Sequence, residues 1–207
     1  MILVGRYMSP FVRRVGISMT LAGIKFDRLV ISSMTDREKL LEINPLGRVP
    51  ALILGKGKNA EALVDSTAIL DYVDEKAGPR KALTPARGPA RRRVLKIVYL
   101  ALGTLEKLVG AVYEKGRRPP EKVHQPWLDQ LESQVAGGLA ALNAIVPKPY
   151  LAGTKLTQAD VTAAVLFASV RRMAPHLAPD GRYKRLEAHA RKMEKLPAFI
   201  ACRPEKP

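Results

Sequence analysis

Residues 49–78 have the sequence VPALILGKGKNAEALVDSTAILDYVDEKAG, in which two short apolar runs precede a segment of helical period. The runs VPALIL and EALV are separated by GKGKNA, a stretch typical of a hairpin connection. The helical segment begins near Ser66, repeats its apolar residues every three or four positions, and stops at Gly78. These residues therefore predict an antiparallel strand pair followed by a helix, with Ser66 as the helix cap.

The residues before this stretch predict two more strands and two helices. Strands are expected at residues 2–4, which are all apolar, and at residues 26–31, which alternate in polarity. A helical turn or two is expected at residues 35–43, with Thr35 as cap. Because early strands joined through a helix pair in parallel, we expect the two N-terminal strands to do so. The order β-α-β-α-β-β-α is that of a thioredoxin-like α/β domain.

The first helix begins at a candidate functional position. Ser9 suits the helix cap, and Pro10 suits the first helical position, where a missing N–H costs nothing. A serine hydroxyl at a helix N-terminus can also point into a site, because the helix dipole favours negative charge there. Apolar residues then recur at helical spacing as far as Gly23, which predicts that Arg13 and Arg14 lie on the opposite, solvent side.

The second half of the chain is predicted to be all-α. Composition changes at residues 78–89, which contain three prolines and predict a linker. Beyond them strand signals end, and helices are expected at residues 90–116, 121–146 and 156–173, with one or two short closing helices. Thr157 and Asp160 fit a capping box at the start of the third helix. We therefore expect an α/β domain at residues 1–77 and an all-α domain at residues 90–207.

The chain carries an uneven positive charge. Of its 35 Lys and Arg and 19 Asp and Glu, residues 1–80 hold 12 and 9, whereas residues 81–207 hold 23 and 10. The helical half thus has a net charge of +13, which either steers anionic molecules toward it or forms a solvated basic surface that keeps the protein soluble. No zinc-ligand spacing or basic-aromatic interleaving accompanies the charge, so a nucleic-acid partner is not expected. With one cysteine, no signal-peptide pattern and no membrane-length apolar run, a soluble cytoplasmic protein is expected.

Two loop motifs carry candidate binding chemistry. In NPLGRVP, residues 44–50, Pro50 is either a routine strand edge or a cis proline that leaves the N–H and C=O of Val49 free to pair with an extended peptide. In DSTAI, Asp65 and Ser66 are either a helix cap or a binding site. As a site, Asp65 would meet an ammonium group, while Ser66 and its N–H would hold a carboxylate. A ligand with both groups is the end of an α-amino acid.

Taken together, four motifs resemble the cytosolic glutathione transferase family across essentially the whole chain. They are SPFVRRV (9–15), NPLGRVP (44–50), DSTAILDYVDE (65–75) and LTQADVTAAV (156–165). Their order and spacing are far more specific than any one of them. The serine in SPF is similar to that of the tau, theta and zeta-like classes.

The resemblance implies that the α/β domain binds glutathione as cosubstrate and that no metal is needed. Ser9 takes the place of the serine that donates a hydrogen bond to the glutathione sulfur and favours its thiolate. Tyr7, two residues earlier, is the second candidate, because other classes use an activating tyrosine near this strand end.

The resemblance also assigns the residues that hold the rest of glutathione. Val49, followed by Pro50, would hold the cysteinyl backbone, and the neighbouring Arg48 would pair with the glycine carboxylate. Asp65 and Ser66 would hold the γ-glutamyl end, although Asp65 is one methylene shorter than the glutamate most family members carry.

The electrophile is expected between the two domains. Candidate contacts are Phe11 in the first helix and Tyr99, Leu102 and Tyr113 in the long helix, which fall near helical repeats of one another. The three residues of the long helix fit interhelical packing or dimer contacts equally well.

The function implied is that of a glutathione S-transferase, a homodimer in which the thiolate attacks a soft electrophile. Conjugation, peroxide reduction, dehalogenation and isomerisation all begin with this thiolate, so the choice among them stays open. The alternative is a non-catalytic binding protein of the same fold, which uses its basic helical face for an anionic partner.

Overall fold

Four strands form a mixed sheet in the order β2-β1-β3-β4. The strands are β1 (Ile2–Val4), β2 (Asp27–Leu29), β3 (Ala51–Leu54) and β4 (Glu61–Val64). β1 and β2 pair in parallel and β3 and β4 antiparallel, as predicted, and β1 also pairs antiparallel with β3. β2 is shorter than the expected strand at residues 26–31.

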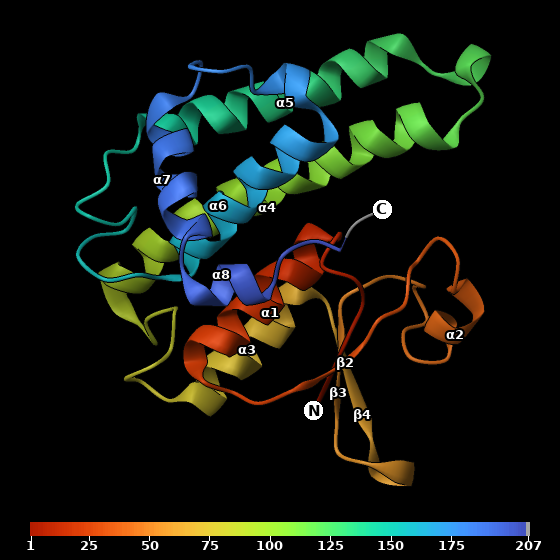
Figure 1. Ribbon diagram of the computed structural model, residues 1–207, viewed down its shortest axis with the longest axis vertical. Coiled ribbons are helices and arrows are strands. Elements are labelled where there is room, and N and C mark those ends of the chain that lie inside the picture. Colours follow the sequence, from red (N-terminus) through yellow and green to blue (C-terminus); the bar gives the residue numbers. More distant parts are fainter. Residues whose placement is uncertain (206–207) are drawn as a thin grey trace. The chain divides into compact units, whose positions relative to one another are not determined.

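Helices lie on both sides of this sheet. α1 (Pro10–Ala22) and α3 (Ser66–Ala77) pack against each other on one face, and α2 (Arg37–Leu41) lies on the other side (Figure 1). Leu40 of α2 is fully buried in a cluster with Val4 and Ala51. The element order confirms the thioredoxin-like βαβαββα arrangement.

Two of the predicted helix caps are wrong by one residue. α3 is capped by Asp65, whose carboxylate accepts a hydrogen bond from the amide of Thr67 at 2.6 Å, so Ser66 is the first helical residue. α2 begins at Arg37 with Asp36, not Thr35, at its N-cap position. The Asp36 carboxylate makes no capping hydrogen bond to the helix and instead accepts a hydrogen bond from the loop amide of Ser32 at 2.9 Å.

The prediction that Arg13 and Arg14 face solvent is wrong, because both side chains are buried. The outer side of α1 is covered by α3 and by α8 (Pro197–Ala201), a helix from the far end of the chain. Arg13 donates from Nε to the carbonyl of Cys202 at 2.9 Å. Periodicity within one helix carries no information about such distant partners.

The structure describes residues 1–205 and divides the chain into two units. The first is Met1–Pro85 together with the C-terminal segment that begins at Leu196, and the second is Ala86–Lys195. This division differs from the expected domain at residues 90–207, since the last segment packs on the α/β unit through α8. Phe199 of that helix is fully buried.

The second unit is all-α, as predicted. It contains α4 (Gly88–Arg117), α5 (Gln125–Ala144), α6 (Gln158–Met173) and α7 (Lys184–Glu194), and α4 packs along both α5 and α6 (Figure 1). The capping box at the start of α6 is confirmed, with the amide of Thr157 donating to the Asp160 carboxylate at 2.8 Å. Within residues 1–205, no helix combines the length and apolar character that a membrane span requires.

Candidate functional site

Strand register brings three loops together at one edge of the sheet. Val4 at the end of β1 pairs with Ala51 at the start of β3, and Ala51 pairs with Val64 at the end of β4. The residues that follow or precede these positions therefore leave the sheet side by side: Gly5 to Ser9, Val49 and Pro50, and Asp65 and Ser66. The structure thus places three of the predicted site segments next to one another.

Ser9 is the N-cap of α1 and is partly exposed. Its Oγ accepts a hydrogen bond from the amide of Val12 at 3.5 Å, which is long for an N–H···O contact. The hydroxyl is therefore weakly held by its own helix and retains its proton for another acceptor. The N-terminus of α1 adds its partial positive charge, so the position favours an anionic acceptor.

Tyr7, the second candidate for sulfur activation, lies elsewhere. Its side chain is 3% exposed, and a methyl group on Gly16 would lie 2.8 Å from the phenolic oxygen. Gly16 is seven residues along α1 from Ser9, a rise of about 10 Å, so the hydroxyl is directed at the middle of the helix. Burial, and after it the nearby Cys202, raise the pKa of the Tyr7 hydroxyl. The geometry therefore gives Tyr7 a packing role instead of a place beside Ser9.

The loop before β3 presents a backbone edge at Val49. The Val49–Pro50 peptide bond is cis. The amide and carbonyl of Val49 take part in none of the backbone–backbone hydrogen bonds formed by residues 1–205. Asn44, which is buried, fixes the loop by donating from Nδ2 to the carbonyl of Arg48 at 2.8 Å and accepting from the amide of Leu46 at 3.0 Å. The Arg48 side chain is exposed.

Asp65 and Ser66 occupy different environments. Asp65 is exposed and has a φ of 71°, the left-handed region that few residues other than glycine adopt. Ser66 is 1% exposed, and its Oγ accepts a hydrogen bond from Nη1 of the buried Arg14 at 3.0 Å. The site therefore has a carboxylate at the surface and a guanidinium below the first turn of α3.

Sequence reasoning did not find Arg14 and Asn44, the two buried residues that support this edge. Asn44 had a local signal, since an asparagine before proline and glycine is typical of a turn whose side chain bonds to the backbone. Arg14 had no local signal, because its partner Ser66 is 52 residues away.

The predicted electrophile contacts belong to both units. Phe11 is partly exposed on α1, Tyr99 and Tyr113 are exposed on α4, and Leu102 is buried. The guanidinium of Arg117 lies 3.6 Å from the ring centre of Tyr113. These four residues remain a prediction.

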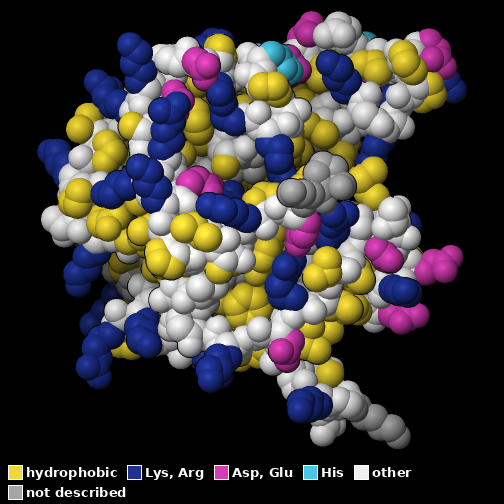
Figure 2. All heavy atoms as spheres, viewed as in Figure 1, with side chains coloured by type: hydrophobic (Ala, Val, Ile, Leu, Met, Phe, Trp, Pro, Cys, Tyr) yellow, Lys and Arg dark blue, Asp and Glu magenta, His cyan; other side chains and the backbone are white. Residues whose placement is uncertain are grey.

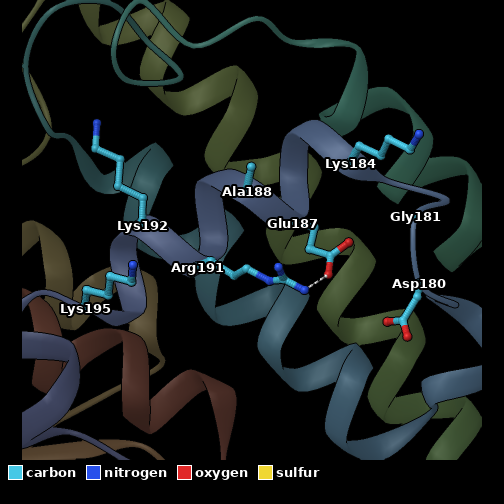
Figure 3. A pocket seen from close by; sticks show the side chains of 8 residues that line it. All are labelled: Asp180, Gly181, Lys184, Glu187, Ala188, Arg191, Lys192 and Lys195. Atoms are coloured by element: carbon cyan, nitrogen blue, oxygen red, sulfur yellow. Dashed lines mark hydrogen bonds and ion pairs between the residues drawn. The ribbon is translucent and has the colours of Figure 1, made fainter.

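The basic face of the helical unit is the alternative site. Lys and Arg side chains are spread over the face drawn in Figure 2. Along α7 there is a depression of about 580 Å³. Figure 3 shows that the side chains of Lys184, Lys192 and Lys195 extend in different directions, while Arg191 is paired with Glu187 at 2.6 Å. The depression therefore has positive charge, but the three lysines do not converge on one anion.

Comparisons with known proteins find matches to both units of the chain. Residues 3–81 match the family model described as glutathione S-transferase, N-terminal domain, and residues 125–192 match the model of the C-terminal domain. The chain is 30% identical over 184 residues to the Escherichia coli (strain K12) protein named "Uncharacterized GST-like protein YibF", covering 84% of each chain.

Solved structures of similar proteins match nearly the whole of this chain. A glutathione transferase family member from Pseudomonas fluorescens Pf-5, crystallised with bound glutathione, is 29% identical, with a TM-score of 0.86 and 99% of each chain covered. A glutathione S-transferase from Methylobacillus flagellatus KT with glutathione bound is 26% identical, with a TM-score of 0.89 and the same coverage.

Proposed function

The chain belongs to the glutathione S-transferase family, and we propose that it is a glutathione transferase in which Ser9 activates the sulfur. The observation that carries this proposal is the strand register that sets Ser9, Val49 and Asp65 at one edge of the sheet. Glutathione is an extended peptide with a thiol in its middle residue and an ammonium and a carboxylate at its γ-glutamyl end. Each of these features has a matching group at that edge.

The chemical step begins with ionisation of the thiol. A free cysteine thiol has a pKa of about 8.5 and is mostly protonated at neutral pH. The Ser9 hydroxyl donates a hydrogen bond to the sulfur in its anionic form, and the N-terminus of α1 stabilises the same charge. Each unit by which the thiol pKa falls corresponds to about 1.4 kcal/mol in favour of the thiolate. The thiolate then attacks the electrophile, and Ser9 itself forms no covalent bond.

The remaining groups hold the peptide in place. The free amide and carbonyl of Val49 pair with the cysteinyl backbone in the manner of a β-strand. The exposed Asp65 carboxylate binds the ammonium group. The first turn of α3, which begins at Ser66 and has the Arg14 guanidinium beneath it, attracts the γ-glutamyl carboxylate. Arg48 pairs with the glycine carboxylate. Phe11, Tyr99, Leu102 and Tyr113 are kept as candidates for contact with the electrophile.

We infer that the protein acts as a cytoplasmic homodimer, as the resemblance implies. Its second substrate is a soft electrophile, and the class of that electrophile is to be found by assay. With an activated aryl halide, wild-type protein is expected to consume glutathione faster than the same reactants do in buffer without protein. Reaction with an alkyl halide, an organic peroxide and a cis-enone separately tests dehalogenation, peroxide reduction and isomerisation.

The same preparation tests the non-catalytic alternative. The transferase proposal predicts retention on immobilised glutathione at salt concentrations that release the protein from a plain cation exchanger, because ionic retention falls steeply with salt. If the two resins release the protein at the same salt concentration and no glutathione is consumed, the anionic-partner alternative is favoured.

A further inference from the structure

We propose that Glu205, near the end of the chain, is a positioning residue for Ser9 and acts together with Arg28. The proposal rests on the transferase function given above, since it concerns the same serine. No motif in the sequence links these two residues, which are 177 positions apart.

The carboxylate of Glu205 divides its two oxygens between two partners. Oε1 forms an ion pair with Nη2 of Arg28, and Oε2 accepts a hydrogen bond from the amide of Met8 at 3.1 Å. Met8 is the residue immediately before Ser9. Glu205 therefore binds the backbone of the loop that carries the proposed catalytic hydroxyl.

Arg28 extends this contact along the same loop. Its guanidinium lies 3.6 Å from the ring centre of Tyr7, and Nη2 also donates to the carbonyl of Gly5 at 3.4 Å. The Glu205–Arg28 pair thus contacts Gly5, Tyr7 and Met8, three of the four residues between β1 and Ser9. Both charged side chains are about three-quarters buried, which strengthens their attraction relative to a surface pair.

Backbone hydrogen bonds hold the loop at both of its ends. The amide of Gly5 donates to the carbonyl of Leu29 at 2.9 Å, and the amide of Ser9 donates to the carbonyl of Arg6 at 3.0 Å. Among residues 1–205, the Ser9 hydroxyl accepts the long 3.5 Å hydrogen bond from Val12. The Glu205–Arg28 pair adds contacts at the Gly5 carbonyl and the Met8 amide, and these contacts help to fix where the hydroxyl points.

The charges of the pair also predict an asymmetry between its two members. Glu205 adds a negative charge close to the residue that stabilises the thiolate, and Arg28 offsets it. Partial burial would raise the pKa of Glu205, but hydrogen bonds from Arg28 and the backbone hold it below its usual value, so the carboxylate is charged at neutral pH. Removal of the Arg28 charge alone is therefore expected to disfavour the thiolate more than removal of the Glu205 charge alone.

The test compares Glu205→Ala, Glu205→Gln and Arg28→Gln, with Glu61→Gln on the exposed edge of β4 as a matched control. The thiolate absorbance of glutathione-saturated protein is followed against pH, and the glutathione Kd is measured by calorimetry. Glu205→Ala is expected to raise the thiol pKa so that the thiolate fraction falls roughly fivefold to tenfold at low pH, because losing the contact that positions Ser9 outweighs removing a nearby negative charge, with Kd changed less than about threefold. Glu205→Gln is expected to recover part of the loss, because its amide oxygen still accepts from Met8. Arg28→Gln is expected to show the largest rise.

A second readout needs no glutathione. Hydrogen exchange at the Met8 amide is expected to be at least tenfold faster in Glu205→Ala than in Glu61→Gln, with the melting temperature used to correct for global stability. If wild-type protein does not ionise bound glutathione, the proposed function fails. If wild type ionises it and Glu205→Ala has the same thiol pKa as Glu61→Gln, or if Met8 exchange is unchanged, the positioning role of Glu205 is overturned.

Discussion

Arg14 donates a hydrogen bond from Nη1 to Oγ of Ser66 over 3.0 Å, and each residue is only 1% exposed. The bond connects the second turn of α1 to the first turn of α3, the two helices whose N-termini form the proposed site. We attribute to this buried guanidinium a role in glutathione binding, because it adds positive potential beneath the place proposed for the γ-glutamyl carboxylate.

Arg14→Met tests this attribution, because methionine keeps much of the length and removes the charge. The glutathione Kd is expected to rise about tenfold, and the free energy of unfolding to fall by about 1–3 kcal/mol because Ser66 loses a partner. Arg203→Met, at an exposed position of the same unit, is the control. Calorimetry and urea unfolding measure the two effects. Equal Kd values for the two variants would contradict the proposed role of the buried charge.

Asp65→Asn is expected to weaken glutathione binding by about 10- to 100-fold, the value of a charge-assisted hydrogen bond of roughly 1.5–3 kcal/mol. The fold is expected to be retained, because asparagine caps helices as well as aspartate and tolerates the positive φ at this position. A glutathione analogue without the α-amino group provides the cross-check. It should bind wild type and Asp65→Asn equally. If Asp65→Asn weakens the binding of this analogue as much as it weakens the binding of glutathione, Asp65 does not bind the ammonium group.

Tyr7→Phe is expected to leave the pKa of bound glutathione within about 0.3 units of wild type, since the hydroxyl is directed at Gly16 and not at Ser9. The loss of this buried hydroxyl is expected to change the free energy of unfolding by no more than about 1.5 kcal/mol. Thiolate absorbance measures the pKa of bound glutathione, and thermal unfolding measures the stability of the variant. If the thiol pKa rose by a unit or more in this variant, tyrosine and not serine would be the activating residue.

Two adjacent glycines of α5 give a prediction for the helical unit. A methyl group on Gly138 would overlap Thr104 of α4, whereas one on Gly137 would have no neighbour within 4 Å. Gly138→Ala is therefore expected to destabilise by about 1–3 kcal/mol, and Gly137→Ala to stabilise by about 0.5–1 kcal/mol. The urea concentrations at the unfolding midpoints of the two variants are measured and compared with that of wild type. Similar midpoints would mean that α4 and α5 are not as close as described, and Gly138→Ala combined with Thr104→Ala should recover part of the loss.

The features that sequence predicted correctly are local. Ser9 with Pro10, and Thr157 with Asp160, start their helices through contacts within three or four residues, and Gly23 ends its helix in the left-handed conformation. The order of strands and helices, and hence the fold, follows from such signals together with the pairing rules for consecutive strands. The three site segments could also be located, because each follows or precedes a recognisable strand.

What sequence did not predict depends on residues far apart in the chain. The periodicity of the first helix predicts that Arg14 faces solvent. That prediction fails because its partner Ser66 lies on another helix. The segment after Leu196 was assigned to the helical domain because nothing in its composition shows that it returns to the α/β unit. The same return brings Glu205 to Met8, so the contact that we propose to position Ser9 had no signal in the sequence.

The central claim is that Ser9 ionises the thiol of bound glutathione, and proton release on binding measures this directly. Calorimetric titration at pH 7 in buffers of different ionisation enthalpy counts the protons. Wild type and the control Ser133→Ala, at an exposed position of α5, are expected to release a large fraction of one proton. Ser9→Ala is expected to bind glutathione within about threefold of wild type while releasing few or no protons, because one hydrogen-bond donor to the sulfur is lost. Proton release by Ser9→Ala equal to that of wild type would contradict the account.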